Sequence, residues 1–192
     1  MTLRRVCASI VALNRPKTPR SAARSKFCVA AVHMRLLDTL AALGPLLEPT
    51  GKPIADVGAR LAGKRVGFYF SAGWCPMCTS FEPTLLAFRE EAAERDVPIE
   101  LIYVPSDRSE KDALKRAMSL QCTMVPYGAA DTLKKAHKVW AGAEAGKLGR
   151  DRRSGVPAIV VMNPDGEEVS FVDAEARGGQ ALKKWDLGSN VF

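Results

Sequence analysis

The chain lacks the features that mark several specialised classes of protein. It has only five cysteines among 192 residues, too few for a small secreted scaffold held together by disulfides. Its apolar runs are short, and none approaches the roughly 18 uninterrupted residues that a membrane-spanning helix needs. With 47% hydrophobic and 26% charged residues, the composition is that of an ordinary folded domain.

Acidic residues are absent from the first 33 positions, which hold seven basic residues: Arg4, Arg5, Arg15, Lys17, Arg20, Arg24 and Lys26. Removing these seven from the 28 basic residues of the chain leaves 21, which balance its 21 acidic residues. The formal charge of +7 therefore belongs to the leader. It gives no support to nucleic-acid binding or membrane binding by the domain that follows.

The leader is rich in Arg, Ser and Ala and has no continuous apolar core, a composition typical of an organellar transit peptide. The small residues at positions 29–31 suit processing there, and we expect import into a plastid slightly ahead of a mitochondrion. Two other interpretations stay open: a disordered basic tail, or translation that starts at Met34 and yields a cytoplasmic protein. Under either, Cys7 and Cys28 have no structural role.

Short apolar runs alternate with helical patterns after residue 33 and predict an α/β fold in one domain over residues 34–192. Strands are expected at 65–70, 99–104, 158–162 and 168–172, and helices at 34–43, 75–96, 109–120, 131–142 and 179–185. A small edge hairpin is expected within 46–57, and a charged loop over 142–155. The strand–helix–strand–helix order predicts parallel pairing of the first strands, and the turn at 163–166 predicts an antiparallel last pair.

Cys75-Pro76-Met77-Cys78 places two thiols three residues apart directly after a buried strand. Residues i and i+3 share a helix face, so both sulfurs come within disulfide reach, with Cys75 open to solvent and Cys78 shielded. A helix start contributes about 0.3–1 kcal/mol toward a thiolate, whereas a pKa near 7 needs about 2 kcal/mol. Hydrogen bonds to the Cys75 sulfur, including one from the Cys78 thiol, are therefore expected as well. Pro76 suits the first helical position, and Trp74 is expected to shelter the sulfurs.

A metal site and a purely structural disulfide are the alternatives for this motif. Zinc needs two further ligands, and after residue 33 the chain adds only Cys122 and His137 without a second paired motif. An iron–sulfur cluster lacks its four thiolates for the same reason. The strand-to-helix position argues against a structural disulfide. We therefore expect a reactive dithiol with no metal and no other cofactor.

The run Tyr69–Cys78, Y-F-S-A-G-W-C-P-M-C, resembles the active-site segment of the thioredoxin superfamily, in particular its tryparedoxin and nucleoredoxin branch. The resemblance extends over roughly residues 36–185. It implies a thioredoxin-like α/β fold with a central mixed sheet flanked by helices. It also implies that Pro83 kinks the active-site helix, that Pro157 is a cis-proline beside the redox pair, and that Asp107 is an acidic residue common in that branch.

The same resemblance implies a thiol–disulfide oxidoreductase that reduces protein disulfides. Cys75 would attack the substrate disulfide and Cys78 would resolve the mixed disulfide, with Trp74, Pro76, Val156 and Pro157 supporting the site and holding an extended substrate. A monomer is expected, with electrons supplied by a thioredoxin reductase-type system or by glutathione. A redox-dependent adaptor with little turnover stays open as the alternative, and metal carriage by the two thiols is a third.

The sequence departs from thioredoxin at one position that matters for proton transfer. Tyr69 stands where thioredoxin keeps a buried aspartate, so Glu82 or water must accept the Cys78 proton. Elsewhere, Cys122 is expected to be a half-buried inert thiol and His137 a solvated surface residue. Lys134 is expected on the polar side of the same helix, opposite Leu133. Trp140 and Trp185 are expected to pack in or beside the core. The basic loop residues Arg150, Arg152 and Arg153 are expected to be solvated, with steering of an acidic partner as the alternative.

Overall fold

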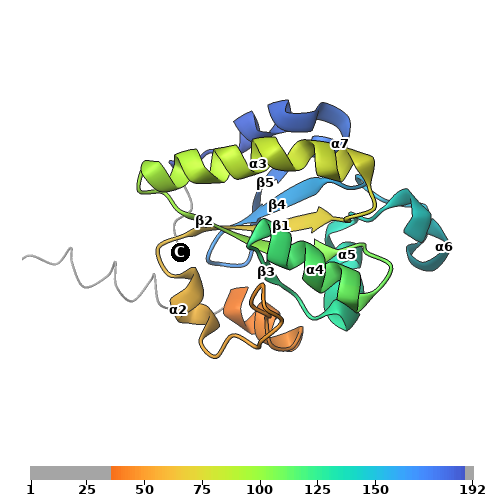
Figure 1. Cartoon of the computed structure of the whole chain (residues 1–192), viewed down its shortest axis with the longest axis horizontal. Coiled ribbons are helices and arrows are strands. Elements are labelled where there is room, and N and C mark those ends of the chain that lie inside the picture. The colour runs from red at the N-terminus through yellow and green to blue at the C-terminus, as the bar shows by residue number, and fades with distance from the viewer. Residues whose placement is uncertain (1–35, 189–192) are drawn as a thin grey trace, which may run out of the picture.

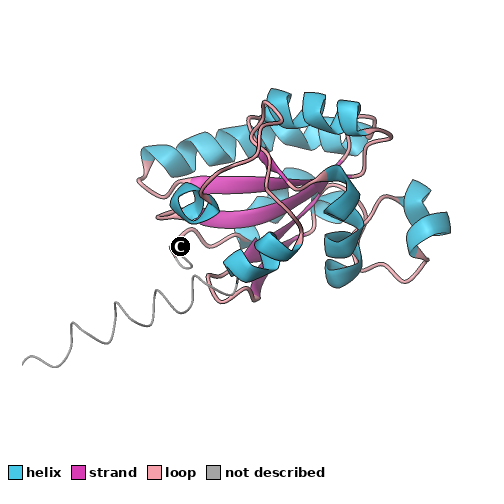
Figure 2. Ribbon diagram, turned by 90° about the horizontal axis from the view of Figure 1, so that it is seen from below, coloured by secondary structure: helices cyan, strands magenta, loops and turns pink. Residues whose placement is uncertain are grey.

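The computed structural model describes residues 36–188. The basic leader, with Cys7, Cys28 and Met34, lies outside the described residues, so the transit peptide and its alternatives stay predictions. A five-stranded sheet lies at the centre, with helices packed on both sides (Figures 1 and 2). None of the helices within residues 36–188 combines the length and the apolar character needed to cross a membrane.

The sheet is mixed, as predicted, and its strands follow the order β3-β2-β1-β4-β5. The strands are β1 (Arg65–Ser71), β2 (Ile99–Pro105), β3 (Thr123–Met124), β4 (Ala158–Met162) and β5 (Glu168–Val172). The first three run parallel, whereas β4 is antiparallel to β1 and to β5. Every residue of β1 and β2 is buried, which agrees with their continuous apolar runs. Strand β3 is only two residues long, too short for a pattern in the sequence to predict it.

Two groups of helices cover the two faces of the sheet. The helical segments are residues 36–42, α2 (Val57–Leu61), α3 (Pro76–Glu94), α4 (Glu110–Leu120), α5 (Ala130–His137), α6 (Ala145–Leu148) and α7 (Ala174–Arg177), with 3-10 turns η1 (Tyr127–Ala129), η2 (Gly142–Glu144) and η3 (Gly178–Lys184). Helices α3 and α4 pack on the face that carries Tyr69 and Tyr103. Residues 36–42, α2 and α5 pack on the opposite face, with Phe68 and Phe70.

Three element predictions were wrong in extent. Helix α5, expected to run to residue 142, ends at His137, because Lys138 takes a left-handed conformation (φ 56°) and Val139 then bridges to Ser154. The expected loop over 142–155 contains η2 and α6. The expected final helix is the 3-10 segment η3, preceded by α7.

The predicted edge hairpin is present in reduced form. Leu47 forms single antiparallel bridges with Pro53 and with Met124 of β3, so the loop does lie at the sheet edge. Its second arm is shorter than predicted, because α2 begins at Val57. The carboxylate of Asp56 caps that helix by accepting a hydrogen bond from the Ala59 N–H at 2.9 Å.

Two side chains of α5 expected in solvent are more enclosed than that: His137 is half-buried and Lys134 is buried. The His137 side chain is 15% exposed, and its ring lies 5.7 Å from the Phe68 ring between centroids. Lys134 keeps only 3% of its side chain exposed, with Nζ 2.5 Å from Glu144 Oε1. The segment η2, which the sequence analysis treated as loop, supplies that partner. Lys134 is therefore buried because of a tertiary contact, which helical periodicity in the sequence cannot predict.

Candidate functional site at the start of α3

The two cysteines lie where strand β1 gives way to helix α3. Cys75 is the N-cap residue of α3, and Pro76 takes the first helical position, where a missing N–H leaves no hydrogen bond unmade. The Cys75 Sγ accepts a hydrogen bond from the Cys78 backbone N–H at 3.4 Å. Both cysteines are free thiols. The first turn of the helix thus brings the two side chains together, as their spacing predicts.

The two thiols differ in exposure. Cys75 is 7% exposed and Cys78 fully buried, so Cys75 is more enclosed than the sequence analysis expected. Burial, and next a hydrogen bond to Cys75, raise the pKa of the Cys78 thiol to about 12, although Ser71 and the Ala72 backbone oppose the rise. Cys78 is therefore protonated at neutral pH and must lose a proton before it can attack a disulfide.

The loop before β4 closes the site from the other side. The Cys75 thiol lies 3.7 Å from the Val156 carbonyl oxygen, to which it donates. The Val156–Pro157 peptide bond is cis. The structure thus brings Val156 and Pro157, named from the family resemblance, next to the cysteine pair.

Two residues that sequence reasoning missed hold this loop in place. Glu175 of α7 accepts a hydrogen bond from the Gly155 N–H at 2.5 Å, and Asp173 accepts one from the Ser154 hydroxyl at 2.9 Å. A Cβ on Gly155 would collide with the Glu175 carboxylate and the Arg152 guanidinium, so a larger residue there would displace these two side chains. The glycine before Val-Pro was the one available signal, but nothing in the sequence pointed to its partner.

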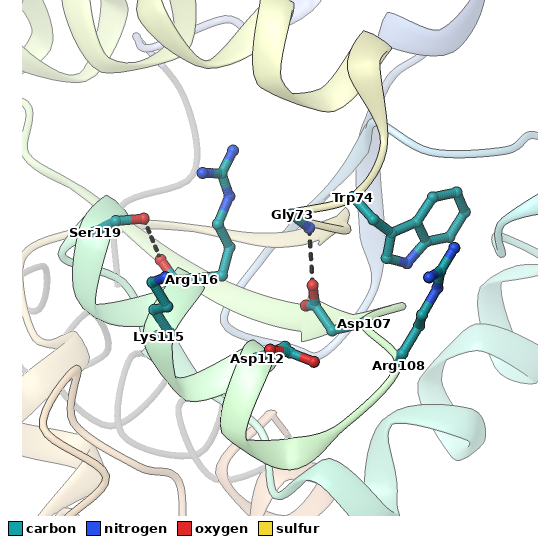
Figure 3. A pocket seen from close by; sticks show the side chains of 8 residues that line it. All are labelled: Gly73, Trp74, Asp107, Arg108, Asp112, Lys115, Arg116 and Ser119. Carbon is teal, nitrogen blue, oxygen red and sulfur yellow. Dashed lines mark hydrogen bonds between the residues drawn. The ribbon is translucent and has the colours of Figure 1, made fainter.

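Asp107 fixes the turn that carries Trp74. Its carboxylate accepts a hydrogen bond from the Gly73 N–H at 2.8 Å (Figure 3). It accepts another from the Tyr103 hydroxyl at 2.5 Å. The Trp74 indole N–H donates to the Ser106 carbonyl at 2.9 Å. The Trp74 ring is 38% exposed, and the Arg108 guanidinium lies 5.8 Å from its centroid. The indole is therefore oriented by the end of β2 and still presents a surface next to Cys75.

Two hollows flank the cysteine motif. One, of about 480 Å³, lies between Trp74 and α4. Its charged lining is mixed but mainly basic: Arg108, Lys115 and Arg116 with Asp107 and Asp112 (Figure 3). The other, of about 340 Å³, lies between the start of α3 and α7, where Met77 is 48% exposed. The exposed surface next to Cys75 thus has a mainly basic hollow on one side and a more apolar hollow on the other.

Glu82 lies one turn after Cys78 on α3. Its side chain is 8% exposed, and it forms an ion pair with Arg116 of α4. Burial raises the pKa of the Glu82 carboxyl, and the Arg116 charge opposes that rise. Pro83 lies inside α3.

The remaining candidates lie away from the pair. Cys122 is 1% exposed, more buried than expected, and burial raises its pKa to about 12. Trp140 and Trp185 are buried, as predicted. Arg152 and Arg153 form ion pairs with glutamates on α7 and β5, and Arg150 is exposed. Within residues 36–188 no three His, Cys, Asp or Glu side chains are grouped to hold a metal ion.

Known proteins resemble the chain in both sequence and structure. It is 31% identical over 142 residues to probable nucleoredoxin 1 of Arabidopsis thaliana and 28% identical over 127 residues to nucleoredoxin of Mus musculus. These alignments cover 73% and 66% of this chain but 22% and 26% of the relatives. The chain thus spans about a quarter of the length of the curated relatives it matches.

Solved structures extend the likeness to the fold. Tryparedoxin I from Crithidia fasciculata superposes with a TM-score of 0.55 at 25% identity, over 77% of this chain and 90% of that one. Thioredoxin from Wuchereria bancrofti superposes with a TM-score of 0.52 at 28% identity, over 76% and 95%. The model of the family described as Thioredoxin-like matches residues 63–168, a range that contains the cysteine pair, Asp107 and Pro157. The chain therefore belongs to the thioredoxin-like family.

Proposed function

We propose that the protein is a thiol–disulfide oxidoreductase that reduces disulfides through Cys75 and Cys78. One observation carries the proposal: Cys75 caps helix α3 with its sulfur 3.4 Å from the Cys78 N–H, while Cys78 is buried one turn inside. Backbone N–H groups at a helix start stabilise negative charge on a sulfur. This arrangement suits an outer attacking thiol and an inner resolving thiol.

The reaction uses two successive exchanges. The Cys75 thiolate attacks one sulfur of the substrate disulfide, which breaks that bond, forms a mixed disulfide and releases the first substrate thiol. Cys78, once deprotonated, then attacks the Cys75 sulfur and releases the second substrate thiol. The substrate gains two electrons and two protons, and the protein ends with a Cys75–Cys78 disulfide. An upstream dithiol protein or glutathione returns the pair to the reduced state.

The surroundings of Cys75 support an extended substrate. The Val156 carbonyl faces the attacking sulfur at 3.7 Å, and Trp74 and Met77 expose apolar surface on either side of the motif. A backbone group and two flanking side chains can hold a chain on both sides of a disulfide. We propose protein or small-molecule disulfides as substrates and a monomer as the working form.

Insulin disulfide reduction tests the proposal. With dithiothreitol as electron source, the wild-type protein is expected to accelerate insulin precipitation, and Cys75→Ser to show only the uncatalysed rate. Cys122→Ala removes a buried thiol that lies away from the Cys75–Cys78 pair. It serves as the matched control and should retain activity within about twofold. Activity retained by Cys75→Ser contradicts the assignment.

A redox-dependent adaptor is the second candidate. The exposed side chains of Trp74 and Met77 favour it, because they offer a surface on which a partner can bind. Cys78→Ser cannot resolve mixed disulfides, so an oxidoreductase should trap many disulfide-bearing clients on Cys75. An adaptor should instead retain one or two partners after reduction with dithiothreitol. Mass spectrometry of the eluates before and after reduction separates the two.

The leader carries a separate proposal about location. We propose that residues 1–33, acid-free and basic, direct import into an organelle, with a plastid ahead of a mitochondrion. Fusing residues 1–33 to a fluorescent protein tests this by microscopy. Diffuse cytoplasmic fluorescence would support a start at Met34 or a simple basic tail.

A further inference from the structure

Four buried polar atoms without a hydrogen-bond partner come from elements that meet beneath the cysteine pair. Among residues 36–188, the unpartnered buried side-chain atoms are Tyr69 Oη, Ser71 Oγ, Glu82 Oε1, Arg116 Nε and Trp185 Nε1. The first four belong to β1, α3 and α4, whereas Trp185 packs near Phe88. Buried polar atoms in folded proteins nearly always have partners, so a group of four exceptions calls for a functional explanation.

Glu82 and Cys78 face the same buried side of α3. They are four residues apart in one helix, which places their Cβ atoms about 5–6 Å apart, and both side chains are more than nine-tenths buried. Tyr69, on the strand beneath, interacts electrostatically with both, and its own pKa is raised chiefly by burial. Ser71 lies near enough to Cys78 to favour its thiolate. Tyr69 thus interacts with both Cys78 and Glu82, and Ser71 with Cys78, so the two hydroxyls of β1 lie on the side of α3 that carries the thiol and the carboxylate.

The environment of Glu82 keeps one oxygen free to accept a proton. Arg116 donates to Oε2, and Oε1 has no partner. The titratable or charged groups that face the carboxyl are Arg116 from α4, Tyr69 from β1 and Asp107 after β2. Of these, the Arg116 cation and the Tyr69 hydroxyl favour the ionised form, and Asp107 opposes it.

Arg116 connects this carboxylate to a hollow that is open to solvent, because it both pairs with Glu82 and lines the hollow. Figure 3 shows the Arg116 side chain extending from α4 toward α3, at the wall of the basic hollow beside Trp74. The arginine side chain is 19% exposed, against 8% for Glu82. A single side chain, that of Arg116, therefore separates a proton held on Glu82 from an open pocket.

We propose that Glu82 accepts the proton of Cys78 during the resolving step, relayed by the Tyr69 and Ser71 hydroxyls, and releases it to the hollow at Arg116. This inference rests on the proposed redox function. The Cys78 S–H bond breaks, the thiolate attacks the Cys75 sulfur, and the carboxylate becomes a carboxylic acid. The Cys75–substrate S–S bond breaks as the Cys75–Cys78 bond forms, the departing sulfur takes the electron pair, and Glu82 returns its proton to water.

A chromogenic aromatic disulfide, 5,5′-dithiobis(2-nitrobenzoate), separates the two steps on one trace. Cys75 attack releases a first coloured thiolate, and Cys78 attack on the resulting mixed disulfide releases a second. This leaving group is a weak base that needs no protonation, so the second phase reports on Cys78 deprotonation. All proteins carry Cys7→Ser and Cys28→Ser, so that the leader contributes no signal.

Glu82→Gln is expected to slow the second phase about ten- to a hundredfold at pH 7, in the range of general-base effects, and to leave the first phase within about twofold. The variant's second phase should rise with pH and converge with the wild-type rate in alkaline solution. A purely electrostatic role predicts the opposite, because removing a nearby negative charge makes Cys78 easier to deprotonate. The matched control is Glu90→Gln, an exposed residue of α3, which should change neither phase.

Arg116→Met tests the same step with Glu82 retained. Without its cation, Glu82 is expected to hold a proton near neutral pH, so the second phase should slow at pH 7 and recover as pH rises. A second phase that is unchanged or faster in Glu82→Gln overturns the proposal. A wild-type protein that releases only the first thiolate contradicts the proposed function itself, and this inference with it.

Discussion

Glu82 and Glu100 are both carboxylates with side chains less than a tenth exposed, yet their surroundings differ. Glu100, on β2, accepts hydrogen bonds from Arg60 Nε at 3.1 Å, from Lys64 Nζ at 2.8 Å and from the Thr123 hydroxyl. Glu82 has Arg116 on one oxygen and no partner on the other. One carboxylate is fully paired, and the other is left half paired, one turn from a thiol.

The pairing of the two carboxylate oxygens distinguishes a structural carboxylate from a functional one. A buried carboxylate with both oxygens paired joins separate elements, here α2, β2 and β3. A buried carboxylate with a free oxygen costs stability, and such a cost persists where a reaction uses the free group. The comparison therefore predicts that substitutions at Glu100 lower stability, whereas substitutions at Glu82 change proton transfer.

Glu100→Ala is expected to have the largest effect on stability. Breaking a buried ion pair costs about 3–5 kcal/mol, and we expect about 3 kcal/mol because Arg60 and Lys64 are partly exposed and regain water. Urea unfolding measures the loss. The ratio of the two thiol-release phases should stay at the wild-type value, and a changed ratio would remove the contrast between the two glutamates.

Alkaline pH should destabilise the reduced protein because the buried thiols of Cys78 and Cys122 lose their protons. The pKa values of Cys78 and Cys122 are about 12 in the fold, above the 9.0 of a free thiol. The folded state therefore holds both protons more tightly, and the stability they contribute is complete below pH 9 and lost as pH rises toward 12. Between pH 8 and about 10.5 each thiol should account for a loss on the order of 2 kcal/mol.

Urea unfolding of the wild type and of Cys122→Ala at both pH values isolates one thiol. Between the lower and the higher pH, the unfolding free energy of the variant should fall less than that of the wild type. Equal losses would mean that Cys122 titrates in the fold as it does in the unfolded chain.

Glu82→Gln should show a smaller effect with the opposite sign to that of Glu100→Ala. Burial raises the pKa of Glu82 in the fold, so its contribution to stability is full below the unfolded pKa and lost as pH rises through the folded one. Glutamine mimics the protonated form. The variant's unfolding free energy should therefore gain on that of the wild type between pH 4.5 and pH 7.5. If the unfolding free energy of the variant instead falls relative to that of the wild type over this range, Glu82 is a structural carboxylate like Glu100.

Tyr69→Phe should have the smallest effect on stability and still slow the resolving step. The hydroxyl it removes is buried and unpartnered, so the unfolding free energy should stay within about 1 kcal/mol of the wild type. The second thiol-release phase should slow several-fold because one relay group is missing. Tyr103→Phe, which loses hydrogen bonds to Asp107 and the Ser71 carbonyl, is the matched comparison and should lose more stability.

The centre of the fold and the cysteine junction could be predicted from the sequence. The strand at Ala158–Met162 and its partner at Glu168–Val172 match the predicted bounds, because an apolar run and an Asn-Pro-Asp-Gly turn are local signals. The helix start at Pro76 is equally local, since Cys-Pro follows a buried strand. The position of Pro157 beside the cysteines came from the family resemblance.

What could not be predicted depends on contacts between distant segments. Glu175 is recognisable as an anchor only once α7 lies next to Gly155. Lys134 and His137 were expected in solvent because helical spacing does not show which segment folds over α5. The unpaired oxygen of Glu82 likewise becomes visible only when every neighbour is placed.

A redox titration of the Cys75–Cys78 pair tests the central claim most directly. The protein is equilibrated in buffers of reduced and oxidised glutathione, quenched with acid and an alkylating reagent, and analysed by peptide mass. The account predicts a single two-electron transition confined to the peptide with both cysteines, at a potential in the range of about −270 to −120 mV spanned by dithiol oxidoreductases. Separate glutathione adducts on the two cysteines, or thiols that stay reduced in every buffer, would contradict it.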